Sequence, residues 1–205
     1  MKKNISIIFA LFSAIYLVGL SYPTNISWLL KIVPIAVLAM AVLKTKSSKT
    51  NTYLLIALGF SATGDTLLEM NLFIYGVGAF LLAQLSYATL FARHWKGLNQ
   101  RWPLSLGLLV YIFLMAYILL PNLGDLQLPV IAYLIAISFM GLMAIQSDYP
   151  LRWAVLGALV FISSDSLIAI DKFLHPIPGR SYWIMLTYYG AQWMLIDGAL
   201  RRSNR

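Results

Sequence analysis

The sequence contains no cysteine and only two histidines. The lack of cysteine excludes disulfides, thiolate nucleophiles, Fe–S clusters and cysteine-ligated zinc. His94 and His175 fall outside the long apolar segments, on opposite sides of the predicted membrane. They are therefore poorly placed to share a metal site or to serve a Ser-His-Asp triad. We predict no metal and no other cofactor.

Charged residues are also scarce, at 11% of the chain against roughly 25% in soluble domains. Hydrophobic residues make up 60%, and the mean hydropathy is +0.79. No hydrophilic stretch is long enough to fold alone. The sequence therefore predicts a multi-pass integral membrane protein in which residues 1–205 form a single transmembrane domain.

The sequence instead contains several long apolar segments. About 20 apolar residues are needed to cross the hydrocarbon core as an α-helix. Eight segments approach that length, so we predict an all-α protein with eight transmembrane helices. The predicted spans are 4–21, 26–43, 51–69, 72–92, 103–120, 127–146, 151–171 and 181–200.

The basic residues predict how these spans are oriented. Fifteen Lys and Arg give a net charge of +8, but they lie mostly in short loops, which is typical of the positive-inside distribution and not of nucleic-acid binding. Lys31 falls inside a span, Lys172 and Arg180 fall on one side, and the rest on the other, so both termini should be cytoplasmic. Short loops favour a bacterial inner membrane. The predicted cytoplasmic residues are Lys2, Lys3, Lys44, Lys46, Lys49, Arg93, Lys96, Arg101, Arg152, Arg201, Arg202 and Arg205.

Two spans carry an aspartate in similar surroundings. Residues 59–68 read GFSATGDTLL and contain Asp65, and residues 160–168 read VFISSDSLI and contain Asp165. An ionisable residue inside a membrane is costly and normally faces a protein interior or a wet cavity, so each aspartate is a candidate functional residue.

The following spans also match, since Phe80-Leu-Leu-Ala-Gln84 resembles Tyr188-Tyr-Gly-Ala-Gln192. The matching spans are four helices apart and cross in the same sense. This favours a 4+4 parallel internal repeat with halves of roughly 1–100 and 101–205. Chance similarity between Leu- and Ala-rich helices is the alternative.

Counting residues from the span ends places several polar side chains at related depths. Lys31, Asp65, Asp165, Gln84 and Gln192 all fall in the outer half of the predicted bundle. Glu69 shares a helix face with Asp65 but should lie at the interface. Near the opposite end, Asp197 and Arg201 have the spacing of an ordinary helical salt bridge.

The order of these motifs resembles the YhhN-like lysoplasmalogenase family over nearly the whole chain. One departure is Gln84, where many relatives would carry a histidine. The resembling elements are Lys31 and Pro34; Gly64, Asp65 and Leu68; Phe73, Gly76 and Phe80; Tyr133 and Met143; Gly157, Ala158, Leu159, Phe161, Ser164, Asp165, Ser166, Ile168 and Ala169; and Tyr189 and Gln192.

The resemblance implies a membrane hydrolase that cleaves the vinyl ether bond of lysoplasmalogens, with a lysophospholipid substrate and membrane lipid as its partners. The reaction needs a proton on the β-carbon, stabilisation of an oxocarbenium ion and attack by water. One protonated and one ionised carboxyl would suffice, so Asp65 and Asp165 are the candidate acid/base pair.

Five further residues are candidates for substrate binding. Lys31 would hold one aspartate ionised or bind the phosphate. Gln84 and Gln192 would position water or the head group, Ser164 would bond to its neighbour, and Tyr189 follows from the family motif.

Three alternatives remain open from the sequence. Lys31 and Asp65 could form a purely structural ion pair. The intramembrane Asp and Lys could serve a proton-coupled transporter of small molecules or lipids, although such a carrier should have polar residues along its full depth. The protein could also be a non-catalytic scaffold that binds lipid.

Overall fold

The computed structural model describes residues 3–22, 24, 26–46, 48–98 and 100–203. Lys2 and Arg205, which entered the charge count, lie outside this part. The described residues contain helices and no strand, which confirms the all-α prediction. The α-helices are α1 Lys3–Gly19, α2 Ser27–Leu43, α3 Lys49–Glu69, α4 Phe73–Ala92, α5 Trp102–Leu119, α6 Gln127–Ile145, α7 Leu156–Phe173 and α8 Arg180–Ser203.

Each predicted span corresponds to one of these helices, and the ends agree to within about three residues except at α7, which begins five residues after the predicted start at 151. Four helical segments are long and apolar enough to cross a membrane by length and composition: Phe73–Ala92, Trp102–Asn122, Gly124–Ile145 and Leu151–Phe173. Helices α1 and α2 are apolar but have 17 residues each. The protein is an integral membrane protein, and eight crossings remain a prediction.

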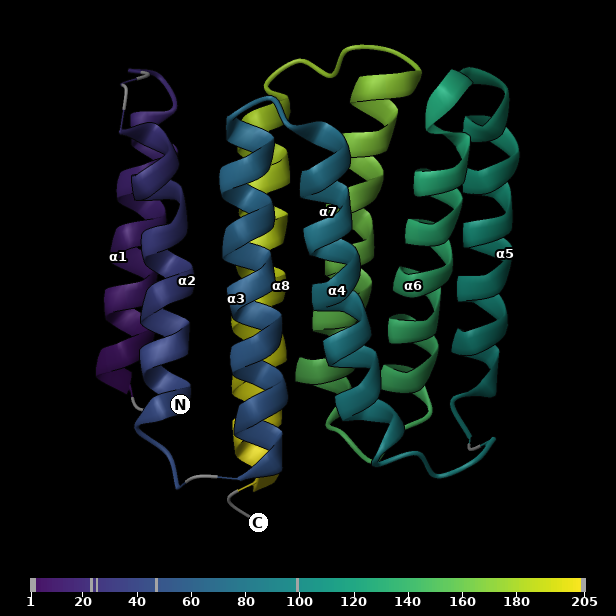
Figure 1. The fold of residues 1–205 in the computed structure, drawn as a ribbon. Helices are drawn as coiled ribbons and strands as arrows, with labels where there is room; N and C mark the ends of the chain where they lie inside the picture. The colour runs from purple at the N-terminus through teal and green to yellow at the C-terminus, as the bar shows by residue number, and fades with distance from the viewer. Residues whose placement is uncertain (1–2, 23, 25, 47, 99, 204–205) are drawn as a thin grey trace.

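The helices run alternately up and down and lie side by side (Figure 1). Both chain ends lie at the same end of the bundle, here called the terminal end; the opposite end is called the distal end. Helices α3, α4, α7 and α8 form the middle of the bundle, α1 and α2 cover one side, and α5 and α6 cover the other. The cytoplasmic placement of the terminal end and the 4+4 repeat remain predictions.

Helices α7 and α8 approach each other closely because glycine faces backbone at two places. A Cβ atom at Gly157 would lie 2.9 Å from the Leu195 amide nitrogen, and one at Gly198 would lie 2.7 Å from that of Ala154. Ala154 belongs to a single π-helical turn, Leu151–Val155, that precedes α7. Near this contact, Arg201 Nε donates to Asp197 at 2.5 Å, which confirms the predicted salt bridge.

An aromatic cluster occupies the middle of the bundle and consists of Phe80, Phe161 and Tyr188. The three rings pack edge-on, with centroids 5.6 to 6.4 Å apart. Gly64 makes room for this cluster, because a Cβ atom there would lie 2.6 Å from the ring of Phe80. The cluster therefore fixes the position of the Tyr188 hydroxyl, which reaches the residues described next.

Candidate active site at the distal end of the bundle

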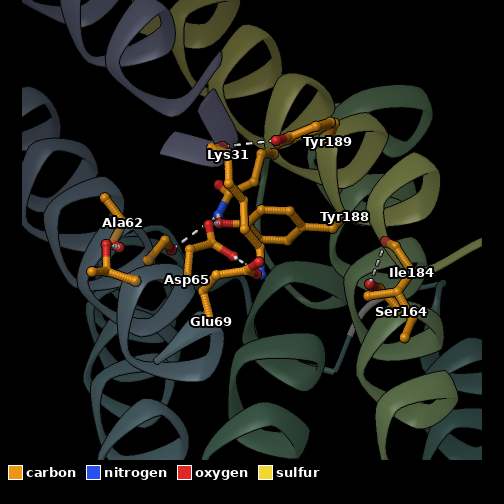
Figure 2. A network of polar contacts seen from close by, with 11 residues as sticks. Lys31, Ala62, Asp65, Glu69, Ser164, Ile184, Tyr188 and Tyr189 are labelled. Atoms are coloured by element: carbon orange, nitrogen blue, oxygen red, sulfur yellow. Dashed lines mark hydrogen bonds and ion pairs between the residues drawn. The ribbon is translucent and has the colours of Figure 1, made fainter. Parts of the chain in front are cut away.

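Asp65 lies in a buried cluster of charged and phenolic groups supplied by α2, α3 and α8. Lys31 Nζ is 3.7 Å from Asp65 Oδ1 and 3.4 Å from Glu69 Oε2, and the Tyr188 hydroxyl donates to Asp65 Oδ2 at 2.7 Å. Figure 2 shows these side chains converging on Asp65. Asp65 is 2% exposed and Lys31 is 8% exposed. The Asp65 carboxylate is thus compensated by one cation and one hydrogen-bond donor, both within the protein.

Gln192 of α8 forms hydrogen bonds with residues of this cluster and its surroundings. Its amide nitrogen donates to Ser61 Oγ at 2.9 Å and to the Tyr188 hydroxyl at 3.4 Å, and its amide oxygen accepts from the Tyr87 hydroxyl at 2.6 Å. The Gln192 side chain is fully buried. The structure therefore places Gln192 where it orients Tyr188 toward Asp65.

Tyr189 and Ser164 each use their hydroxyl to join two helices. The Tyr189 hydroxyl donates to the backbone carbonyl of Lys31 at 2.7 Å and so ties α8 to α2. The Ser164 hydroxyl donates to the carbonyl of Ile184 at 3.0 Å and so ties α7 to α8. Figure 2 shows this second contact at a distance from the Asp65 cluster.

Asp165 has a different set of neighbours. The Tyr133 hydroxyl of α6 donates to Asp165 Oδ2, and the Gln84 amide of α4 donates to the Tyr133 hydroxyl at 3.3 Å. No ion pair to Asp165 is present among the described residues. The fully buried Gln84 carbonyl oxygen has no hydrogen-bond partner in the same part of the chain. Asp165 is therefore hydrogen-bonded but has no compensating cation.

Asp165 and Tyr133 line two small apolar cavities. One has a volume of about 60 Å³ and lies between α4, α6 and α7. The other, of about 50 Å³, lies between α5, α6 and α7. Apolar residues make up most of both linings: Phe73, Val77, Phe80, Val130 and Phe173 in the first, and Ile112, Met115, Leu119, Leu134 and Ile162 in the second. The Asp165 carboxyl thus lies in an otherwise largely apolar lining.

A larger polar cavity of about 320 Å³ adjoins the first apolar cavity at the distal end. Leu68, Phe73 and Ile168 line both cavities. The charged residues around the polar cavity are Lys31, Glu69, Asp171, Lys172 and Arg180. An amphiphilic molecule would find a charged compartment next to an apolar compartment that contains a carboxyl group.

The two aspartates have different hydrogen-bond partners, Tyr188 for Asp65 and Tyr133 for Asp165. Asp65 itself is not among the residues that line the cavities above. The residues that the structure describes contain no cluster of three His, Asp or Glu side chains able to hold a metal ion. The groups available for chemistry are therefore carboxyl, phenol, amide and ammonium.

Sequence reasoning did not single out the phenols that bind the two aspartates. Tyr133 and Tyr188 served only as motif residues, because a tyrosine within a span resembles an ordinary apolar residue. A usable signal existed for Tyr188, which is four residues before Gln192 and so shares its helix face. Glu69, expected at the interface, is half-exposed and also binds Lys31.

Comparison with known proteins relates the chain to a named family. The YhhN family matches residues 26–199. Lysoplasmalogenase TMEM86A of Bos taurus is 35% identical over 201 residues, which cover 88% of this chain and 80% of the relative. Lysoplasmalogenase TMEM86B of Homo sapiens is 34% identical, covering 86% and 78%. A lysoplasmalogenase of Mycobacterium bovis is 31% identical, covering 78% and 65%. No solved structure matches significantly.

Proposed function

Because the chain belongs to the YhhN family, we propose that it hydrolyses the vinyl ether bond of lysoplasmalogens, releasing a fatty aldehyde and a glycerophospho head group. The three relatives above all carry the name lysoplasmalogenase and support a hydrolase of this kind. Their names do not favour the transporter alternative.

The observation that carries the proposal is the position of Asp165. It lines an apolar cavity that shares three residues with a charged cavity. A lysophospholipid has a single chain and a charged head group, and its vinyl ether lies at the junction between them. Bound across the two cavities, it would bring that junction close to the Asp165 carboxyl.

The surroundings of the two aspartates favour different charge states. Lys31 stabilises the ionised form of Asp65, whereas a partly buried carboxyl in an apolar lining without a cation favours the neutral form of Asp165. Asp165 is then the general acid that protonates the β-carbon of the vinyl ether. The negative charge of Asp65 stabilises the oxocarbenium ion that forms.

Water completes the reaction. After giving up its proton, the Asp165 carboxylate accepts one from the water that attacks the α-carbon, and a hemiacetal forms. The hemiacetal then collapses to the aldehyde and the glycerol hydroxyl, which leaves Asp165 protonated again. Gln84 would orient Tyr133 through its amide nitrogen and water through its carbonyl oxygen, which has no hydrogen-bond partner among the described residues.

The test is aldehyde release from lysoplasmalogen by the purified protein in detergent. We expect activity in the wild type and no cleavage of the alkyl ether analogue, which lacks the double bond. Asp165→Asn should lower kcat by about 10²- to 10⁴-fold, the usual contribution of a general acid. Asp65→Asn should also lower it, by a smaller factor.

Asp125→Asn is the matched control, because Asp125 is exposed in a short 3-10 turn between α5 and α6. An inactive wild type, or full rates in both Asp65→Asn and Asp165→Asn, would overturn the proposal.

A further inference from the structure

Lys172 stands out among the charged residues around the polar cavity. Lys31 is bound by Asp65 and Glu69, and Arg180 is bound by Asp171. Lys172 makes no ion pair within the described residues, and its one contact of this kind is with an aromatic ring. It is therefore the cation that remains able to bind an anion in the cavity.

The ring that Lys172 contacts marks the boundary between the two cavities. Lys172 Nζ lies 4.2 Å from the centroid of the Phe73 ring, a cation–π contact. Phe73 lines both the polar and the apolar cavity and packs edge-on against Phe173, with centroids 5.9 Å apart. The ammonium group is thus held where the charged compartment meets the apolar one.

Lys172 also lies on the same face of α7 as Asp165. The two residues are seven apart on α7, which is close to two helical turns, so they lie on the same face about 10 Å apart along the axis. Helical side chains lean toward the N-terminus, so the lysine reaches back along this face toward Asp165. Ile168, between them, lines both cavities.

We propose that Lys172 binds the phosphate of a single-chain glycerophospholipid and thereby sets the distance between the head group and Asp165. The glycerol unit would lie along α7 beside Ile168, and the start of the chain would enter the apolar cavity. This inference rests on the proposed function for the identity of the reacting bond. The binding site itself does not depend on catalysis.

The test uses ligands that lack the vinyl ether. The thermal stability of the purified protein in detergent is measured with lysophosphatidylcholine, with monoacylglycerol of the same chain, and with glycerophosphocholine or inorganic phosphate alone. We expect lysophosphatidylcholine to stabilise the wild type, and Lys172→Met to weaken its binding by about 10- to 100-fold, the loss of one charged hydrogen bond. Binding of monoacylglycerol should not change.

Lys44→Met is the matched control, since Lys44 is exposed at the terminal end and should leave all binding intact. Equal affinity of Lys172→Met and wild type for lysophosphatidylcholine would overturn the inference. So would equal stabilisation by inorganic phosphate, which would make the site a general anion site. These binding results stand whether or not the protein releases aldehyde, so the two proposals can fail separately.

Discussion

The surroundings of Asp65 and Asp165 differ although their sequence contexts match. Asp65 is enclosed by Lys31 and Tyr188 and touches none of the cavities described, whereas Asp165 is bonded by Tyr133 and lines two of them. In each case one partner comes from the preceding even-numbered helix, Lys31 from α2 and Tyr133 from α6. That single difference, ammonium against phenol, is the basis of the different charge states that we propose for the two aspartates.

Two similar sequence motifs can thus place a carboxyl at similar positions while the partner residue of each carboxyl determines the charge around it. The ammonium group near Asp65 makes the carboxylate the stable form in a low-dielectric interior. The phenol near Asp165 supplies a hydrogen bond but no charge. Acid/base chemistry by two carboxyls requires such a division, so the asymmetry is what the proposed reaction needs.

The largest effect on stability should come from removing the cation. Lys31→Met leaves the Asp65 carboxylate buried without its ion pair, and breaking a buried pair costs about 3–5 kcal/mol. Thermal unfolding in detergent should show a lower Tm. The double variant Lys31→Met with Asp65→Asn should recover part of the loss, because no unpaired charge remains. A Tm equal to that of the wild type in Lys31→Met would mean that Asp65 is not ionised.

A smaller loss of stability is expected from a substitution at Gly64, the residue before Asp65, which corresponds to Ser164 before Asp165. Gly64→Ala would press a methyl group into the Phe80 ring, and overpacking of this kind costs about 1–3 kcal/mol. Gly59→Ala in the same helix is the matched control, because nothing lies within 4 Å of its added Cβ atom. If both variants melt alike, the aromatic cluster does not constrain α3.

The helices of this fold were predictable because length and hydropathy alone decide which segments can cross a membrane. The predicted helices include α3 and α8, which are not among the four segments long and apolar enough to cross a membrane. The depth of Lys31 and Asp65 followed from counting residues along their spans. Their direct contact, at 3.7 Å, agrees with that count.

What the sequence could not predict was rotation about the helix axes. The roles of Tyr133 and Tyr188 depend on which face each helix turns inward, and apolar residues on all faces hide that choice. Lys172 and Arg180 were predictable only as loop charges. Their place around a cavity depends on how α7 and α8 end relative to α2 and α3.

The two phenols offer a direct test of the charge difference. A hydrogen bond to a charged group contributes about 1.5–3 kcal/mol and one to a neutral group about 0.5–1.5 kcal/mol. Tyr188→Phe should therefore destabilise the protein more than Tyr133→Phe, measured as Tm in detergent. Tyr133→Phe should instead lower kcat for aldehyde release, since it alters the hydrogen bonding of the acid. If Tyr133→Phe destabilised the protein more than Tyr188→Phe, Asp165 and not Asp65 would be the ionised aspartate.

The smallest effect should come from an aspartate whose ion pair is exposed. Asp148, between α6 and α7, accepts two hydrogen bonds from Arg202, at 2.5 and 2.9 Å, and its side chain is 29% exposed. These bonds, with the nearby positive charges, hold the pKa of Asp148 below its ordinary value. A depressed pKa stabilises the folded state when pH lies above the unfolded value, about 3.9 for aspartate.

Asp148→Asn should therefore cost about 1 kcal/mol or less at neutral pH, as exposed pairs generally do. The difference from the wild type should vanish as the pH falls through the folded pKa, because the wild-type carboxylate is then protonated as well. Urea unfolding at pH 7 and near pH 3 measures both values. A loss as large as that of Lys31→Met would show that burial is not what distinguishes the Asp65 pair from ordinary ion pairs in this protein.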